Sequence, residues 1–159
     1  MTQALIQRRS TGRTVRAGGM TVEYLATSDR THDAIGIYRI ILDPASPGAG
    51  PHYHDRMTET FEVHAGTLAM MVDGVPVDAG PGDFILIPPG VVHAFANRGD
   101  VPAVFTLSFT PALGREGFFE GMAQLSDADR LNDTDAMLAL MAGYDQVPVD
   151  GIAGWTQAD

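Results

Sequence analysis

Residues 50–66 read GPHYHDRMTETFEVHAG, and this stretch contains two histidines separated by one residue. Side chains alternate between the two faces of a strand, so His52 and His54 would project to the same face. Two interpretations are open for such a pair. The histidines are either surface residues on a Gly/Pro-rich loop or two ligands of one metal ion, and the surrounding sequence has to decide.

Glu59 favours the metal interpretation. It begins a segment in which Phe61 and Val63 share its face, and this apolar face is the one expected to be buried. A carboxylate buried beside such side chains costs several kcal/mol unless a cation compensates it. A divalent ion held by the two histidines would do so. The same alternation places Glu62 and His64 on the opposite face and excludes them from the site.

A third histidine lies in residues 82–99, GDFILIPPGVVHAFANRG. His93 shares a face with Val91 and Phe95, which places its imidazole on an apolar surface. Taken alone, it is also compatible with a hydrogen-bonded histidine of the core. Three histidines and one glutamate converging inside a small barrel favour a metal site more strongly than any one of them does.

Short segments rich in Val, Ile, Phe and Thr, separated by Gly, Pro and Asp turns, predict an all-β fold between residues 14 and 110. Asp73-Gly74 is a hairpin signal. Strands at this spacing predict a sandwich or a barrel rather than an open sheet. The predicted strands are Met20–Thr27, Ile35–Leu42, Thr60–His64, Thr67–Val72, Val75–Asp78, Asp83–Ile87, His93–Asn97 and Ala103–Phe109.

After Pro111 the sequence favours two helices, at residues 114–125 and 133–143. Their apolar stripe, which includes Met137, Leu138 and Met141, predicts packing onto the barrel. We therefore expect residues 1–110 to form the β-barrel with its N-terminal strands, and residues 111–159 to form a helical extension of the same domain, ending in a strap or tail. Whether these helices act as a lid, with Gly114 and Gly117 as flexible points, is left open.

Charge and composition exclude several classes of partner and site. The formal net charge of −10 argues against nucleic acid and anionic membranes, and no apolar run is long enough for a membrane span. Cysteine is absent, so a metal would have only His, Asp or Glu as ligands. The residues after Arg8-Arg9 are polar, which does not fit a twin-arginine export signal, and we expect a cytoplasmic protein.

Two motifs resemble those of the cupin superfamily. The first cupin motif, G-x5-H-x-H-x(3,4)-E-x6-G, is matched by His52, His54, Glu59 and Gly66, with Ser46 where the motif has its first glycine. The second, G-x5-P-x-G-x2-H-x3-N, is matched in full, by Gly82, Pro88, Gly90, His93 and Asn97. The C-terminal segment also resembles small bacterial cupins related to quercetinases and to polyketide cyclase-type cupins.

This resemblance implies an antiparallel jelly-roll β-barrel, here with two short C-terminal helices, and a homodimer. It also implies one divalent transition metal per chain, Fe, Mn, Ni, Co, Cu or Zn, held by His52, His54, Glu59 and His93. This ligand set does not select among these metals.

The leading functional hypothesis is a quercetinase-like dioxygenase that acts on a small enolisable or aromatic substrate bound to the metal, with Glu59 as ligand and catalytic base. A non-oxidative isomerase, cyclase, decarboxylase or lyase is the alternative, as is a non-catalytic barrel that binds a small ligand. The expected substrate pocket is lined by Met57, Phe61, Met70, Phe84 and Phe95.

Overall fold

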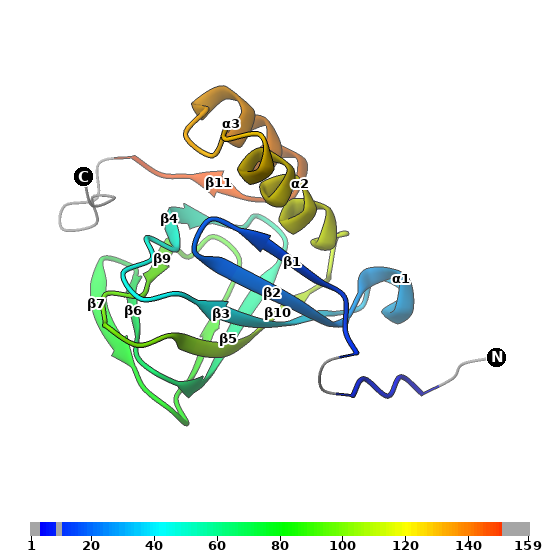
Figure 1. Cartoon of the computed structure of the whole chain (residues 1–159), viewed down its shortest axis with the longest axis horizontal. Coiled ribbons are helices and arrows are strands. Elements are labelled where there is room, and N and C mark those ends of the chain that lie inside the picture. Colours follow the sequence, from blue (N-terminus) through cyan, green and yellow to red (C-terminus); the bar gives the residue numbers. More distant parts are fainter. Residues whose placement is uncertain (1–3, 9–10, 151–159) are drawn as a thin grey trace.

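The computed structural model describes residues 4–8 and 11–150. Two antiparallel sheets face each other and form a sandwich, as the strand pattern predicted, and its jelly-roll topology is the one that the resemblance implied (Figure 1). The six-stranded sheet has the order β1 (Thr14–Ala17), β2 (Met20–Ala26), β3 (Gly36–Leu42), β10 (Ala103–Thr110), β5 (Thr58–Ala65) and β8 (Phe84–Ile87). The five-stranded sheet has the order β11 (Val147–Pro148), β4 (Ala49–Tyr53), β9 (His93–Ala96), β6 (Leu68–Val72) and β7 (Val75–Ala79).

All eight predicted strands are present, with ends that differ by at most two residues. Asp73 and Gly74 both have positive φ, 50° and 77°, and connect β6 to β7 in the expected hairpin. The prediction missed β1, β4 and β11 and the short helix α1 (Ser28–Thr31). Strand β4, AGPHY, has little intrinsic strand propensity, and its extended conformation depends on pairing with β9 and β11.

The core lies between the two sheets and is built from the alternate side chains that face inward. Phe61 from β5 contacts Phe95 from β9, with ring centroids 5.5 Å apart, and so joins the two sheets. Burial follows the predicted alternation along β5, where Glu59, Phe61 and Val63 are at most 1% exposed while Glu62 and His64 face solvent.

Asn97, the last residue of the second motif, stabilises the end of the sandwich beyond β9. Its side chain is 1% exposed, and its amide nitrogen lies 2.8–3.0 Å from the backbone oxygens of Leu42, Asp43 and Val101. Its Oδ1 accepts a hydrogen bond from the Gly99 nitrogen at 3.0 Å. One side chain therefore ties the end of β3 to the connection between β9 and β10.

We expect Asn97→Ala to lower the free energy of unfolding by about 2–4 kcal/mol, because it leaves several buried backbone groups without partners. Urea denaturation measures the change. Asn132→Ala, at an exposed position between the two C-terminal helices, is the control. Equal stability of the two variants would contradict this role of Asn97.

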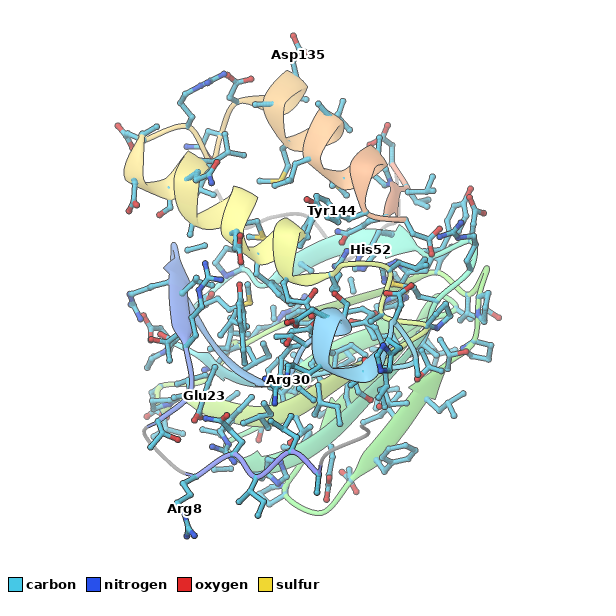
Figure 2. All side chains as sticks on the ribbon, turned by 90° about the vertical axis from the view of Figure 1, so that its right-hand side faces the viewer. Arg8, Glu23, Arg30, His52, Asp135 and Tyr144 are labelled. Atoms are coloured by element: carbon cyan, nitrogen blue, oxygen red, sulfur yellow. The ribbon has the colours of Figure 1, made fainter. Side chains whose placement is uncertain are left out.

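Helices α2 (Glu116–Asp127) and α3 (Thr134–Gly143) cover one end of the sandwich (Figure 1). Figure 2 labels His52 and Tyr144 at this covered end and Arg8 at the opposite end. Phe119 of α2 is buried and meets Tyr38 of β3 edge to face, with centroids 4.9 Å apart. The two predicted helices are therefore present and packed on the sheets.

Two details of the helical region differ from expectation. Leu138 is 43% exposed, so only Met137 and Met141 of the predicted stripe face inward. Gly117 lies within α2, where an added Cβ would be 2.0 Å from the hydroxyl of Tyr144. Its lack of a side chain permits close packing of α2 against the end of α3, which is a different role from that of a hinge. Residues 151–159 of the expected C-terminal strap lie outside the described part.

Candidate metal centre

The four candidate ligands meet between the two sheets. His52 on β4 is the direct register partner of His93 on β9, Glu59 reaches across from β5, and His54 directly follows β4. All four are at most 2% exposed, and one ligand atom from each lies within 4.8 Å of the others. Residues far apart in the sequence are thus brought together at the inner face of both sheets.

Backbone carbonyl groups fix the orientation of all three imidazoles. Each ring places Nδ1 on a carbonyl oxygen, which only accepts hydrogen bonds, so Nδ1 carries the proton and Nε2 is left for the centre of the site. The accepting oxygens belong to Gly50, Asp145 and Val91, at 2.7, 2.6 and 3.0 Å from Nδ1 of His52, His54 and His93, respectively.

The Nε2 atoms of His54 and His93 both point to the same carboxylate oxygen. Oε2 of Glu59 lies 3.1 Å from Nε2 of His54 and 2.6 Å from Nε2 of His93. Three imidazoles with a common tautomer and one buried carboxylate provide the donor atoms that divalent transition metals prefer. The residues therefore fit a metal ion, and the ion would compensate the buried carboxylate.

Burial and mutual contact shift the pKa values of these groups in different directions. Burial lowers the pKa of His52 to about 3, so its ring is neutral at physiological pH. Burial alone would raise the pKa of Glu59, but His93 and His54 outweigh it and hold that pKa well below its usual range. Burial alone would lower the pKa of His93, but the Glu59 carboxylate outweighs it and raises that pKa. Without metal, His93 and Glu59 therefore form a buried ion pair.

Asp145, which follows α3, supports the site and was not predicted from the sequence. Its carbonyl oxygen orients His54, while its carboxylate accepts hydrogen bonds from the backbone nitrogens of Asp55, Arg56 and Met57, at 3.2, 3.0 and 3.0 Å. Its φ of 55° is one that Asp tolerates better than most residues. An Asp between a helix and a strand carries no sequence signal for this role.

A cavity of about 440 Å³ lies between the candidate metal centre and the covering helices. His52 and Glu59 line it together with Arg115 and Gln146. Its apolar wall comes from both the sandwich and the helices. The wall includes Met20, Phe95, Leu107, Phe118, Met122, Leu131, Met137 and Met141.

Of the five residues predicted to line a pocket, only Phe95 borders this cavity. Met57, Phe61 and Met70 are at most 1% exposed and belong to the core. Phe84 is 62% exposed, so its assignment to the pocket was wrong. Phe84 pairs with the outward-facing Glu62 in the β5–β8 ladder, and register partners share a face. The sequence did not reveal this register.

A model of the cupin domain family matches residues 38–109. This segment contains all four candidate ligands and both of the histidine-containing motifs. This chain is a cupin. Its jelly-roll sandwich and its buried His/Glu cluster agree with that assignment. At the irregular first position of the motif, Ser46 is followed by Gly48 with φ +62°, where an added Cβ would be 2.1 Å from the backbone oxygen of Phe95. The position that has to be glycine is therefore residue 48 rather than residue 46, and no candidate ligand is lost.

Two curated relatives match this cupin over about half of its length. Quercetin 2,3-dioxygenase from Bacillus subtilis (strain 168) is 41% identical over 80 residues, which are 45% of this chain and 24% of that protein. Protein SchB from Streptomyces halstedii is 31% identical over 96 residues, which are 50% of this chain and 70% of that protein. The cupin therefore spans about a quarter of the dioxygenase and most of SchB.

The solved structure of the polyketide cyclase RemF from Streptomyces resistomycificus has the same fold. The TM-score is 0.60 at 21% identity, and the match covers 68% of this cupin and 80% of RemF. At this identity the likeness concerns the fold alone. None of the helices in residues 4–8 and 11–150 is long and apolar enough to cross a membrane.

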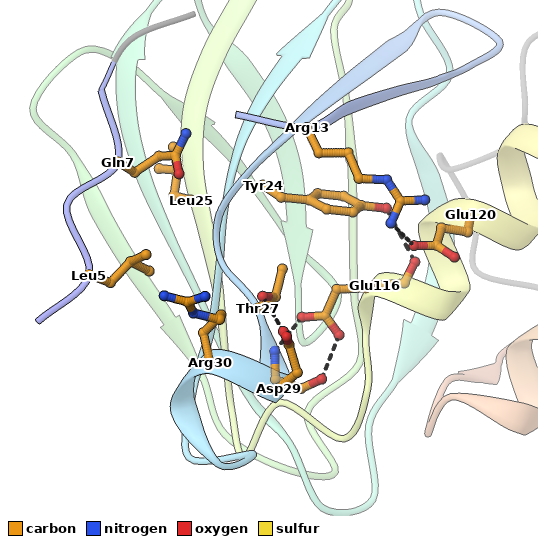
Figure 3. Close-up of a pocket in the computed structure, with 11 residues that line it drawn as sticks. Leu5, Gln7, Arg13, Tyr24, Leu25, Thr27, Asp29, Arg30, Glu116 and Glu120 are labelled. Carbon is orange, nitrogen blue, oxygen red and sulfur yellow. Dashed lines mark hydrogen bonds and ion pairs between the residues drawn. The ribbon is translucent and has the colours of Figure 1, made fainter. Parts of the chain in front are cut away.

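A second cavity of this cupin, of about 530 Å³, lies against the N-terminal segment, α1 and α2, away from the histidines (Figure 3). Its central carboxylate belongs to Glu116, whose oxygens accept hydrogen bonds from the nitrogen and hydroxyl of Ser28 and from the hydroxyl of Tyr38, at 2.6, 2.8 and 2.8 Å. Glu116 thus joins α2 to α1 and β3. The carboxylate at the centre of this cavity therefore serves to dock the helix.

We expect metal affinity to increase as the pH rises through the raised pKa of His93, because the metal must displace the proton shared by His93 and Glu59. His52, whose pKa is lowered, does not compete. The stability of the metal-free cupin depends on pH in the opposite direction. The contribution of His93 to the free energy of unfolding is fully present below its ordinary pKa of 6.5, and it is lost as the pH rises through the raised pKa. Calorimetric titration with Zn²⁺ in buffers of different ionisation enthalpy counts the protons released. Binding without proton release near pH 6.5, below the raised pKa of His93, would contradict the ion pair.

We expect Asp145→Asn to weaken metal binding by about 10–100-fold, as is typical when a group that supports a ligand is changed. Asparagine has nearly the same size as aspartate and also tolerates positive φ. It lacks the negative charge that accepts hydrogen bonds from the backbone N–H groups of Asp55, Arg56 and Met57. Asp129→Asn is the matched control, because Asp129 is exposed and has the same φ of 55°. Competition with a chromophoric chelator measures the affinity. Equal affinity of both variants would show that the Asp145 carboxylate does not contribute to metal binding, since both variants keep the backbone carbonyl that contacts His54.

Proposed function

We propose that this cupin is a metal-dependent dioxygenase of the quercetinase type, acting on a small enolisable or aromatic substrate. The observation that carries the proposal is the convergence of His52, His54, Glu59 and His93 beside a cavity of about 440 Å³ with an apolar wall, which His52 and Glu59 line. The 41% identity to a quercetin 2,3-dioxygenase, over the segment of the chain that aligns, supports the oxidative chemistry.

The proposed ligands are the three histidine Nε2 atoms and the Glu59 carboxylate, with one divalent transition metal per chain. When bound, the metal supplies a Lewis acid that lowers the pKa of a substrate hydroxyl and brings substrate and dioxygen into one site. Glu59 lines the cavity as an ionised carboxylate, and its position there allows it to accept the proton of that hydroxyl. Its role as catalytic base is part of the proposal.

The remaining wall of the cavity would bind the substrate and exclude water. Phe95 and Leu107 contribute from the two sheets, and Met137 and Met141 contribute from α3. The size and apolar lining are typical of sites for small organic molecules. Homodimerisation, a cytoplasmic location and the division at residue 110 stay predictions from the sequence.

The experiment that tests the proposal combines metal analysis with oxygen consumption. The untagged protein is analysed by elemental mass spectrometry and then assayed with an oxygen electrode against a panel of enolisable aromatic compounds. We expect a stoichiometric transition metal and oxygen uptake that depends on both metal and substrate. Conversion of the same substrate under strict anaerobiosis would overturn the dioxygenase and favour isomerase, cyclase, decarboxylase or lyase chemistry.

A further inference from the structure

Arg115, the residue that precedes α2, is buried beside the candidate metal centre. It is 4% exposed, and it is the only one of the arginines in the described part of the chain that reaches this degree of burial. Arginine is almost never fully buried unless its charge is paired. The position of Arg115 therefore requires an explanation.

The hydrogen bonds of Arg115 go to neutral acceptors. Nη1 donates to the backbone oxygen of Tyr144 at 3.1 Å, and Nη2 donates to Oε1 of Gln146 at 2.5 Å. Its guanidinium lies 4.0 Å from the ring centroid of Phe118 and 4.7 Å from that of Phe109. Within residues 4–8 and 11–150, no carboxylate oxygen lies within 4 Å of its nitrogens.

One nitrogen of this guanidinium makes no hydrogen bond. Nε of Arg115 is buried and has no hydrogen-bond partner among the described residues. A buried donor without a partner is rare, and an uncompensated buried charge is costly. Burial lowers the pKa of Arg115 to about 10, so the side chain still carries its positive charge at neutral pH.

Arg115 lines the same cavity as His52 and Glu59. This chain carries a formal charge of −10, and yet it places a cation in the wall of its apolar cavity. The aromatic rings and the two neutral acceptors hold the guanidinium in place, while the carboxylates of Glu59 and Asp145 act on its charge only from beyond 4 Å. A ligand with an anionic oxygen in this cavity would place a compensating negative charge beside the guanidinium.

We propose that Arg115 binds the carboxylate of a small, anionic substrate and thereby orients its remaining part toward His52 and Glu59. The substrate class is an aromatic or enolisable carboxylate. The inference rests on the proposed function for the reaction that follows, but binding of the carboxylate requires only Arg115 and the cavity. The competing explanation is that Arg115 serves only to anchor α2 to the segment after α3.

The test compares benzoate with benzamide, which have nearly the same shape and differ in charge. Both are titrated calorimetrically into the full chain, metal-free and loaded with Zn²⁺. We expect the metal-free protein to bind benzoate at least about tenfold more tightly than benzamide, as a charge-assisted hydrogen bond in a buried site provides. Equal affinity for the two compounds would overturn the proposal and leave Arg115 as an anchor.

Variants then assign the preference to the guanidinium. Arg115→Gln is expected to abolish the preference for benzoate, and Arg115→Lys is expected to retain part of it, because the charge is kept. Arg39→Gln, which removes an arginine that pairs with Glu23 at 2.7 Å away from the cavity, is the control and should bind like the wild type. A folded Arg115→Gln protein that keeps the preference would contradict the proposal.

A measurement on the wild type covers the case in which Arg115→Gln does not fold. The Nε–H resonance of Arg115, assigned through backbone connectivities in ¹⁵N-labelled protein, should shift with benzoate and not with benzamide, while that of Arg39 stays unchanged. An unshifted resonance at saturating benzoate would overturn the proposal. Failure of the dioxygenase proposal would appear separately, as absent metal or absent oxygen uptake, and would leave the benzoate preference in place.

Discussion

His93→Gln should weaken the binding of a divalent transition metal by more than about 100-fold, since loss of a ligand exceeds the effect of changing a supporting group. His93 lies opposite His52 on the neighbouring strand, and it shares a proton with Glu59 across the sheets. Glutamine keeps a similar volume but offers no imidazole Nε2. Metal-dependent turnover should fall with metal content.

The control for this variant is His64→Gln. His64 follows Glu59 on β5 but faces solvent, where its Nε2 lies 2.7 Å from the hydroxyl of Thr106. Elemental analysis and chelator competition report the affinity, and thermal unfolding of the metal-free proteins reports the fold. If His93→Gln is folded and still binds one metal per chain as tightly as His64→Gln, the four residues are not a metal centre.

Glu59→Gln should lower kcat by about 10²–10⁴-fold at a metal concentration that saturates the site, because the amide cannot accept the substrate proton. The substitution also removes the negative charge that meets His54 and His93, so metal binding should weaken as well. Assays at several metal concentrations separate the two effects. The decrease in kcat that remains when metal saturates the site is due to the lost proton transfer.

Glu62→Gln is the matched control for this experiment. Glu62 lies on the same strand but on its exposed face, so the same chemical change occurs outside the site. Stability and turnover of this variant should resemble those of the wild type. Wild-type turnover by metal-saturated Glu59→Gln would exclude Glu59 as the base and leave it, at most, a ligand.

The predictions from sequence succeeded where the signal is local. Alternation along β5 placed Glu59 with Phe61 and Val63 on the buried face, and the Asp73-Gly74 turn located the β6–β7 hairpin. The spacing of the two motifs assigned four residues to one metal site, and the structure places these four residues next to one another. Period-two alternation and turn conformation depend on neighbouring residues only, which is why a single sequence reveals them.

Features that depend on pairing between distant segments were missed or wrong. Phe84 was assigned to the pocket, but the β5–β8 register turns it outward beside Glu62. Strand β4 has a Gly-Pro composition and becomes extended only by pairing with β9 and β11. Register is set by the packing of whole sheets, so the sequence of one strand does not specify it.

The sequence by itself indicated the cupin fold and the four residues of the candidate centre, because the spacings of the two motifs are each contained in a short stretch of the chain. Only the tertiary structure decided what surrounds that centre. Asp145 reaches His54 from 91 residues away, and Arg115 reaches the cavity because α2 folds back over the sheets. Contacts of this kind form when the helices cover the sandwich, and no local pattern in the chain marks them in advance.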